Sequence, residues 1–409
     1  MQPVKLTILG KYWDSQIYAG KLYLFNLEGD IQTVRWDRLI EDVNVKGELK
    51  LALSCAFTQS SLLYGDGSQP FVSDIEIKEV IRKKFELLLL ENINIDQKIK
   101  FENLNYKSKQ QSPFPFPHTD SCIYGKKMFI GSREGLFQAS CDGKTTYAVS
   151  TRVTKGWDSA ISSLSASYRS LAIAAGPEGL FEKSLDDGSL SFAKKESSLL
   201  MKGNFTSCNW LYYSIYGSSN VEGGKLADFK QVDDEDISED ELFKTIYSSR
   251  GNSKKRKLNK VFTDKKLFLN SGSGYSWGNQ DKIFIANDNQ ISILKYKPWD
   301  HENKFTALNT LNLHAWKGQV ISAATALFGT VIECENAIVV LPTEGDPITI
   351  PGEPINWRIF TRSKNYENQL HIIYDDRLEI YSFNHDYFVD QDEKVLGIRR
   401  PSTFRSRYR

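Results

Sequence analysis

Residue types that often carry catalysis are present in this chain, but their spacing matches no metal-binding or phosphate-binding motif. The five histidines are scattered, and none belongs to an H-E-x-x-H or H-x-H pattern. The chain also lacks the G-x-x-x-x-G-K-[ST] sequence of a phosphate-binding loop. His118 and Cys122 are close enough in sequence to share a site, but two ligands are too few for zinc. The sequence therefore predicts no catalytic residue, no metal site and no cofactor, and we expect a protein that is not an enzyme.

Carboxylate pairs, which could support general acid and base catalysis, fall mainly where turns are expected. Asp186-Asp187 and Asp375-Asp376 lie between runs of apolar residues. Aspartate favours the tight backbone geometry of turns, so a turn is the better interpretation of these pairs. An enzyme could still assemble a site from separate parts of the fold, and this alternative stays open.

Two basic segments have the composition of phosphate-binding surfaces. The first, Lys254, Lys255, Arg256 and Lys257, follows an acidic run at residues 233–241. The second is the C-terminal tail, residues 398–409, whose cations alternate with Phe404 and Tyr408 and are Arg399, Arg400, Arg405, Arg407 and Arg409. Arginine with aromatic residues can hold a phosphate backbone or an acidic protein surface. The alternative for the first segment is a solvated, self-neutralising mobile loop over residues 230–260, and for the second a frayed chain end.

One amphipathic helix is predicted at residues 73–92, where Ser73 and Glu76 match a capping box. Apolar residues recur on one face at helical spacing, and charged residues occupy the other. The end of this helix is apolar nearly all round, and it supplies the candidate partner-binding residues Leu87, Leu88 and Leu90. The helix could simply pack on the rest of the fold, or its apolar end could bind another protein. It belongs to a predicted insertion over residues 66–117, which ends in an extended Pro/Phe connector.

These segments interrupt a repeat. Residues 121–143 align without gaps on residues 165–187, with eight identities in 23 positions and an offset of 44 residues. The identities include Glu134-Gly135-Leu136-Phe137 and Glu178-Gly179-Leu180-Phe181. A period near 44 is typical of four-stranded propeller blades. Each unit contains an apolar run, a tight polar turn and a second apolar run, which is the pattern of a β-hairpin.

Weaker copies of the repeat extend over most of the chain. The first residues of the second runs are Ile31, Leu136, Leu180, Leu226, Ile291, Ile338 and Leu378. Four of the six gaps between them are 40–47 residues. The longest gap, between Ile31 and Leu136, could hold a further strand pair at residues 48–64. We therefore predict an all-β chain, a propeller of seven blades within a range of six to eight, built as a single domain over residues 1–409.

In this repeat the chain resembles β-propellers in general. It departs from the WD40 family, because Gly-His and Trp-Asp do not recur at regular intervals, and from the kelch family, because Gly223-Gly224 is a single double glycine. The resemblance implies architecture, and no functional residues are carried over from either family.

The composition indicates which partners and which cellular location to expect. The net charge is +1, so attraction to nucleic acid or membrane has to come from local patches. The five cysteines are widely spread without a C-x-x-C pattern, which argues against a disulfide framework. The first residues lack the apolar core of a signal peptide, and no apolar run reaches membrane-spanning length. We expect a soluble, intracellular, cytoplasmic protein without membrane contact, while the basic run Lys254–Lys257 could serve as a nuclear import signal in a eukaryote.

These features favour a non-catalytic platform for protein–protein interaction, a propeller subunit of a larger intracellular complex. One alternative is a nucleic-acid-associated subunit that uses the basic run and the arginine tail. Another is an enzyme or small-ligand binder with a site on the propeller axis. Salt-dependent binding to nucleic acid would favour the first alternative, and a metabolite or metal retained on purification would favour the second.

Overall fold

The fold is described from a computed structural model, which describes residues 2–64, 74–90, 93–95, 107–141, 149–185, 199–219, 223–231, 256–268, 274–287, 290–308, 310–312, 319–342, 346–363 and 365–384. The chain divides into two compact units. Unit 1 comprises residues 1–113, 141–151 and 320–409, and unit 2 comprises residues 114–140 and 152–319.

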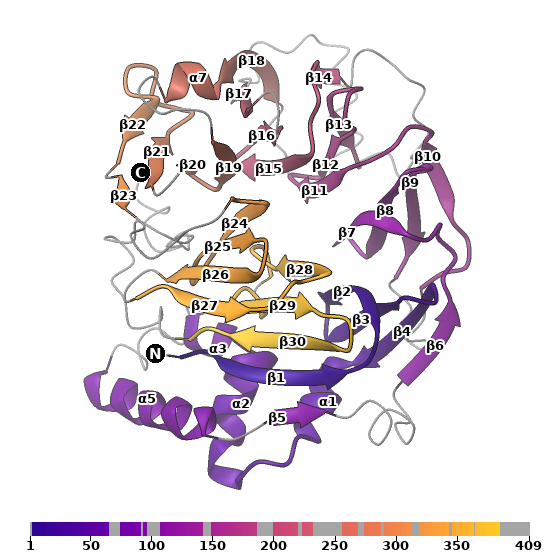
Figure 1. Cartoon of the computed structure of the whole chain (residues 1–409), viewed down its shortest axis with the longest axis vertical. Coiled ribbons are helices and arrows are strands. Elements are labelled where there is room, and N and C mark those ends of the chain that lie inside the picture. The colour runs from indigo at the N-terminus through magenta and orange to yellow at the C-terminus, as the bar shows by residue number, and fades with distance from the viewer. Residues whose placement is uncertain are drawn as a thin grey trace, which may run out of the picture. The chain divides into compact units, whose positions relative to one another are not determined.

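The described residues form seven sheets of four or five strands, antiparallel apart from one parallel strand pair in the last blade, so the chain is a seven-bladed β-propeller, as the repeat predicts (Figure 1). We number the blades in chain order. Blades 6, 7 and 1 belong to unit 1, and blades 2 to 5 belong to unit 2.

Unit 1 joins segments from both halves of the sequence. Blade 1 consists of β2 (Tyr12–Tyr18), β3 (Lys21–Asn26), β4 (Asp30–Arg35) and β6 (Lys107–Gln111). Blade 6 consists of β24 (Ser322–Ala326), β25 (Gly329–Cys334), β26 (Ala337–Pro342) and β27 (Ile348–Pro351). Blade 7 consists of β28 (Asn356–Ile359), β29 (Gln369–Ile373), β30 (Arg377–Ser382), β1 (Val4–Leu9) and β5 (Ile93–Ile95). Its β1 pairs antiparallel with β30 and parallel with β5.

Unit 2 contains four consecutive blades. Blade 2 consists of β7 (His118–Tyr124), β8 (Lys127–Ser132), β9 (Gly135–Ser140) and β10 (Thr154–Trp157). Blade 3 consists of β11 (Ser163–Ser167), β12 (Ser170–Ala174), β13 (Leu180–Ser184) and β14 (Leu199–Met201). Blade 4 consists of β15 (Ser207–Leu211), β16 (Ser214–Ser218), β17 (Lys225–Gln231) and β18 (Arg256–Thr263). Blade 5 consists of β19 (Tyr275–Asn279), β20 (Lys282–Asn287), β21 (Gln290–Tyr296), β22 (Phe305–Ala307) and β23 (Leu311–Asn312).

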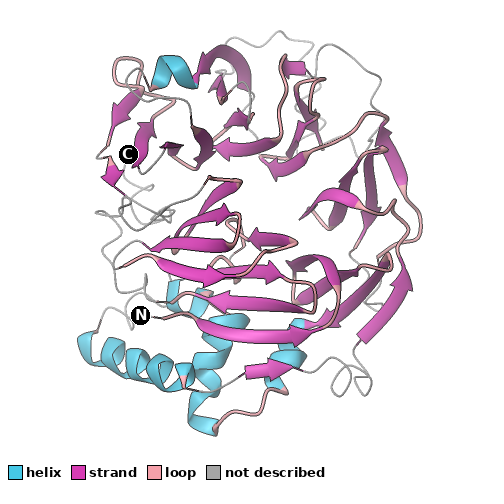
Figure 2. Cartoon of the chain, viewed as in Figure 1, coloured by secondary structure: helices cyan, strands magenta, loops and turns pink. Residues whose placement is uncertain are grey.

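Helices are concentrated in unit 1, where they lie in sequence between β4 and β6 of blade 1 (Figure 2). They are α1 (Trp36–Glu41), the 3-10 turn η1 (Gly47–Leu49), α2 (Lys50–Phe57), α3 (Ser61–Tyr64) and α5 (Ile75–Leu89). Unit 2 has the short helix α7 (Asp264–Leu267). No helix among the described residues is both long and apolar enough to cross a membrane.

The seven apolar residues that anchor the repeat take equivalent positions. Each lies on the third strand of its blade, and each is fully buried: Ile31, Leu136, Leu180, Leu226, Ile291, Ile338 and Leu378. Within each unit, apolar layers connect one blade to the next, for example around Ile161 and Phe181 between blades 2 and 3. A sheet needs such a layer because it cannot bury both faces by itself.

Two sequence predictions fail in the segment between β4 and β6 of blade 1. Residues 48–64 form η1, α2 and α3 instead of a strand pair. The run from Lys50 to Phe57 has no β-branched residue and is rich in alanine and leucine, which favours a helix. The predicted insertion over residues 66–117 is also too long, because β6 returns to blade 1 and pairs with β4.

The structure also corrects the predicted boundaries of one helix and one loop. The predicted helix at residues 73–92 is α5, which begins at Ile75 and ends at Leu89. Its N-cap is Asp74, whose carboxylate accepts hydrogen bonds from the amides of Glu76 and Ile77; Ser73 lies outside the described residues. The predicted mobile loop at residues 230–260 was too wide, since β17 continues to Gln231 and β18 begins at Arg256. Residues 232–255 lie outside the described residues.

Candidate functional site

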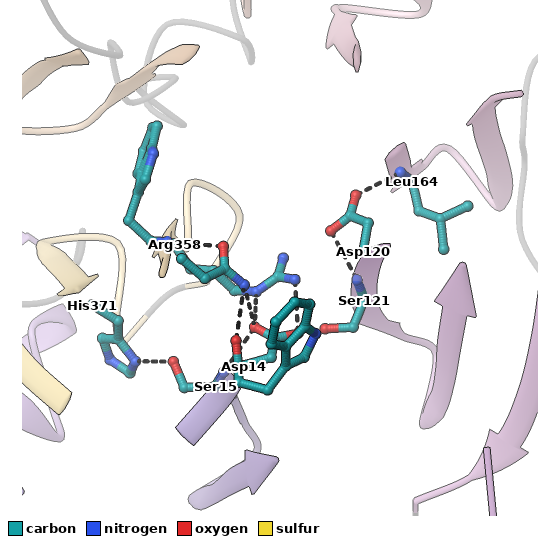
Figure 3. A network of polar contacts seen from close by, with 10 residues as sticks. Asp14, Ser15, Asp120, Ser121, Leu164, Arg358 and His371 are labelled. Atoms are coloured by element: carbon teal, nitrogen blue, oxygen red, sulfur yellow. Dashed lines mark hydrogen bonds and ion pairs between the residues drawn. The ribbon is translucent and has the colours of Figure 1, made fainter. Parts of the chain in front are cut away.

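A buried polar cluster in unit 1 surrounds Asp14, on the first strand of blade 1 (Figure 3). Arg358, on the first strand of blade 7, donates from Nη2 to Asp14 Oδ2 at 2.8 Å and also from Nε to Oδ1. Asn356 donates to Asp14 Oδ1 at 3.2 Å, and the amide of Ser15 donates to the same oxygen at 2.7 Å. The Asp14 side chain is fully buried, so these donors replace the water that a carboxylate otherwise requires. The ion pair joins blades 1 and 7.

His371, on β29, contacts this cluster through Ser15. Its Nδ1 lies 3.0 Å from Ser15 Oγ, and its Nε2 lies 3.3 Å from Gln369 Oε1. The Gln369 amide nitrogen donates to the carbonyl of Phe57 at 2.7 Å, which turns Oε1 toward the imidazole. The His371 Nε2 therefore carries the proton, and Nδ1 accepts the hydrogen bond from Ser15. The pKa of His371 is lowered to about 3, mainly by burial and also by the charge of Arg358, while Asp14 opposes the shift.

A serine beside a neutral histidine has the composition of a nucleophile and its base, but here both side chains are closed to solvent. Ser15 and His371 are each 0% exposed. A substrate would have to displace the core to reach either of them, and a nucleophile needs access as well as a base. The contacts of this pair hold blades 1 and 7 and the end of α2 together, which is a structural role.

Unit 2 contains a similar polar link. Asp120, on the first strand of blade 2, accepts from the Ser121 amide at 2.8 Å and from the Leu164 amide at 2.7 Å (Figure 3). Leu164 lies on the first strand of blade 3, so this carboxylate fastens blade 2 to blade 3. Sequence reasoning missed both aspartates. The available signal was the dipeptide Asp-Ser, which occurs at 14–15 and at 120–121, on the first strands of their blades, and once more at 158–159, between two strands.

Residues 274–278 read Gly-Tyr-Ser-Trp-Gly, which matches the G-x-S-x-G sequence of a nucleophile elbow. The elbow requires a sharp turn between a strand and a helix, whereas Ser276 lies in the middle of β19. Its hydroxyl accepts a hydrogen bond from Tyr216 at 3.0 Å, and the residue is 3% exposed. The match therefore has no catalytic geometry.

The pair Asp375-Asp376 lies in the turn between β29 and β30, in agreement with the turn interpretation. The turn borders an open pocket of about 630 Å³, which Asn336, Glu353 and Tyr374 also line. Arg377 donates to Asp376 at 2.8 Å and to Glu379 at 2.9 Å, and its guanidinium lies over the Tyr374 ring. Arg377 thus balances part of the negative charge of Asp376 and Glu379 beside this pocket. Across the described residues, no three His, Cys, Asp or Glu side chains lie close enough to hold a metal.

Helix α5 leaves apolar side chains on the surface. Its buried residues, Phe85 and Leu88, pack in the core of unit 1 with helix α2 and strand β1. Leu87 is 48% exposed, and Leu90, at the C-cap, is 82% exposed. Of the three predicted partner-binding leucines, the structure therefore places Leu87 and Leu90 at the surface and Leu88 in the core.

The two described residues of the predicted phosphate-binding run, Arg256 and Lys257, lie in different surroundings. Arg256 is partly buried and ion-paired with Glu182 of blade 3. Its guanidinium also lies 4.1 Å from the ring centroid of Phe229 and 4.9 Å from that of Trp210. Arg256 thus joins blades 3 and 4, and burial lowers its pKa although Glu182 opposes this shift. Lys257 is exposed on β18.

The remaining predicted cations lie outside the described residues. They are Lys254, Lys255, Arg399, Arg400, Arg405, Arg407 and Arg409. The tail at residues 398–409 lies outside them as a whole.

Comparison with known proteins identifies no family. No protein-family model matches the chain, and no curated protein matches it in sequence. Among solved structures, it is similar to the WD40 domain of Neurospora crassa Pan2, with 8% identity, a TM-score of 0.45, and coverage of 92% of this chain and 90% of that chain.

Two further solved structures resemble it. The WD40 β-propeller domain of Doa1 has 12% identity and a TM-score of 0.34, with coverage of 67% of this chain and 95% of that one. The extracellular domain of BT4673 from B. thetaiotaomicron has 12% identity and a TM-score of 0.40 over 68% of this chain. The match covers only 35% of the BT4673 domain. At these identities the likeness concerns the fold alone.

Proposed function

We propose that this protein is a non-catalytic platform for protein–protein interaction in an intracellular complex, and that α5 is one of its docking surfaces. The observation that carries the proposal is the apolar surface of α5. Ile75 is 78% exposed, Val80 is 53% exposed and Leu87 is 48% exposed. Large apolar side chains that stay exposed on a surface helix mark a candidate protein-binding site.

The helix is held firmly enough to present this surface. Phe85 and Leu88 anchor it in the core, Asp74 caps its N-terminus, and Lys84 Nζ donates to the carbonyl of Glu48 at 2.9 Å. Val80 and Leu87 are seven residues apart, so they lie on one side of the helix. A partner that brings its own apolar residues to this side would bury both without any rearrangement of α5.

The absence of catalysis is part of the proposal and rests on the burial of the reactive side chains. The Ser15–His371 pair and Ser276 are enclosed, as described above. Burial also raises the pKa of the Cys55 thiol to about 11 and, as its main cause, that of the Cys208 thiol to about 12. These thiols are protonated near neutral pH and react slowly. Buried, protonated thiols support a non-catalytic role.

Affinity purification with quantitative mass spectrometry tests the proposal. We compare the wild type with Val80→Asp/Leu87→Asp, which places two charges in the apolar surface. The matched control, Lys83→Asp/Glu86→Asp, places aspartates at exposed polar positions of the same helix. We expect at least one co-purifying protein to fall tenfold or more with the first variant and to be retained with the control. Equal recovery with both variants, at equal thermal stability, would remove α5 as a docking surface.

A further inference from the structure

The outer strand of blade 4 differs from the outer strands of the other blades. β18 has eight residues, whereas β6 has five, β10 and β27 have four, and β5, β14 and β22 have three. Proteins usually keep edge strands short, because an edge presents unpaired amide and carbonyl groups to any extended chain. Among the described residues, β18 pairs only with β17, so its other edge is open to a further strand.

This edge is also basic. Lys257 and Lys260 are exposed on β18, Lys230 is exposed on β17, and Lys265 and Lys266 are exposed on α7. Lys230 lies directly opposite Lys257 in the pairing of β17 with β18. Like charges at directly opposite positions destabilise a strand pair. A negatively charged ligand at this place would relieve that repulsion.

The carboxylates of the same region are turned inward. Asp228 is fully buried and accepts from Lys304 Nζ at 2.7 Å. Asp264 is buried and accepts from the Gly224 amide at 2.8 Å, and Glu182 is paired with Arg256. Among the described residues, no carboxylate forms an ion pair with the five lysines named above. The surface at β18 is therefore positive, although the whole chain carries a net charge of only +1.

We propose that an acidic, extended segment of a partner protein adds to blade 4 as a further strand along β18. Its backbone would pair with the open edge, and its carboxylates would meet Lys230, Lys257 and Lys260. Leu258 is 37% exposed and Val261 is 40% exposed, so apolar residues of the same segment have surfaces to cover. A nucleic acid would satisfy the lysines but would use neither the open backbone groups nor these apolar side chains. The inference deepens the platform role proposed above by naming a second surface and the chemistry of its partner.

Fluorescence anisotropy tests the inference on the full chain. The probe is a fluorescein-labelled peptide of ten residues in which glutamate alternates with valine or threonine. We expect saturable binding that weakens at least tenfold for Lys257→Glu/Lys260→Glu and changes less than twofold for Lys202→Glu, an exposed lysine between β14 and β15. We also expect at least a tenfold loss when alternate amides of the peptide are N-methylated, since the charge is kept and the strand hydrogen bonds are removed.

Several results would overturn the inference. If the methylated peptide binds as tightly as the unmodified one, the interaction is charge attraction without strand pairing. If an oligothymidylate of equal charge binds more tightly than the peptide, the surface belongs to nucleic acid. Peptide binding seen only after the carboxylates of residues 233–241 are changed to amides would assign the edge to the acidic run of this chain. If the peptide does not bind at all, the proposed site along β18 is wrong. The Val80→Asp/Leu87→Asp variant should bind the peptide normally, which separates this test from that of α5.

Discussion

At the scale of single residues, the repeated block Glu-Gly-Leu-Phe is explained by backbone crowding as well as by burial. Gly135 and Gly179 have φ of 131° and 122°, which favours glycine. A Cβ atom at Gly135 would lie 1.8 Å from the carbonyl oxygen of Trp157, and one at Gly179 would lie 2.5 Å from that of Met201. In both blades, the fourth strand passes too close to the third for any side chain at this position. The recurrence of glycine thus has a steric cause in each copy.

Leu136 and Leu180 follow these glycines and are predicted to make equal contributions to stability. Both are 0% exposed, and the adjoining Phe137 and Phe181 are also buried, as the repeat predicts. We expect Leu136→Ala and Leu180→Ala each to lower the free energy of unfolding by about 2–5 kcal/mol, through lost transfer energy and the cavity left behind. Chemical denaturation measures both values.

The matched controls are Glu134→Ala and Glu178→Ala in the preceding turns, where both side chains are exposed. Surface changes of this kind usually alter stability by about 0.5 kcal/mol or less. Neutral leucines together with critical glutamates would contradict the structural account and assign the repeated glutamate a function.

His371 is predicted to make stability depend on pH. Its pKa in the folded state, about 3, is below the 6.5 of an exposed histidine, so the unfolded chain binds this proton more readily. The stability that neutral His371 contributes is complete above pH 6.5 and is lost as the pH falls toward 3. Between pH 7.5 and pH 5, we expect a loss of about 2 kcal/mol from this residue.

Chemical denaturation of the wild type and of His371→Gln at the two pH values measures this contribution. The variant keeps a polar side chain at the position but cannot be protonated there. The wild type should lose about 2 kcal/mol more than the variant on acidification. Equal losses would mean that His371 does not resist protonation in the folded protein.

At the scale of elements, β18 contains two neighbouring cations with different roles. Arg256 joins blade 4 to blade 3 through Glu182 and the rings of Trp210 and Phe229, while Lys257 is exposed. Arg256→Ala leaves the partly buried Glu182 without its partner, and we expect a loss of about 2 kcal/mol in the free energy of unfolding, between the values typical of an exposed and of a buried ion pair. Lys257→Ala is the control, with an expected change of about 0.5 kcal/mol or less. Similar values for the two variants in chemical denaturation would contradict the assignment of Arg256 to the blade contact.

The third strands of all seven blades could be predicted from the sequence, because each has an apolar residue at its first or second position, shortly after a polar turn. Their anchors, from Ile31 to Leu378, are buried from both sides and leave a strong hydrophobic pattern. The fourth strands leave only a weak hydrophobic pattern in the sequence. β6 reads Lys-Ser-Lys-Gln-Gln and β18 is rich in lysine, because an outer strand faces solvent and has little apolar surface to bury. Polar composition made both strands look like loops.

The site residues could be predicted only in part. The amphipathic pattern identified α5, but the four adjacent leucines, Leu87 to Leu90, all look alike in sequence. Packing against Phe57 and β1 decides that Leu88 is buried and Leu87 is not. The Asp14–Arg358 pair connects residues 344 positions apart, and no local pattern indicates such a contact.

At the scale of the whole molecule, blade 7 is built from residues near both ends of the described chain. β1 pairs with β30 through six residue pairs, from Val4 with Ser382 to Leu9 with Arg377. Val4, Leu6 and Ile8 are buried in the same core cluster as Leu378 and Ile380. The blade is therefore complete only when β1 is in place. This arrangement depends on contacts of long sequence separation, so it forms late relative to the local hairpins.

Removal of residues 1–9 is predicted to destabilise blade 7 selectively. β30 would lose the strand that satisfies half of its backbone groups, and the side chains of Leu378 and Ile380 would gain solvent. We expect amide hydrogen exchange in β29 and β30 to accelerate at least tenfold, whereas exchange in β12 and β20 of unit 2 changes less. Removal of residues 1–3 is the control, because β1 begins at Val4. Unchanged protection of β30 in the longer truncation would show that β1 is dispensable, and blade 7 would then be stable with three strands of its own.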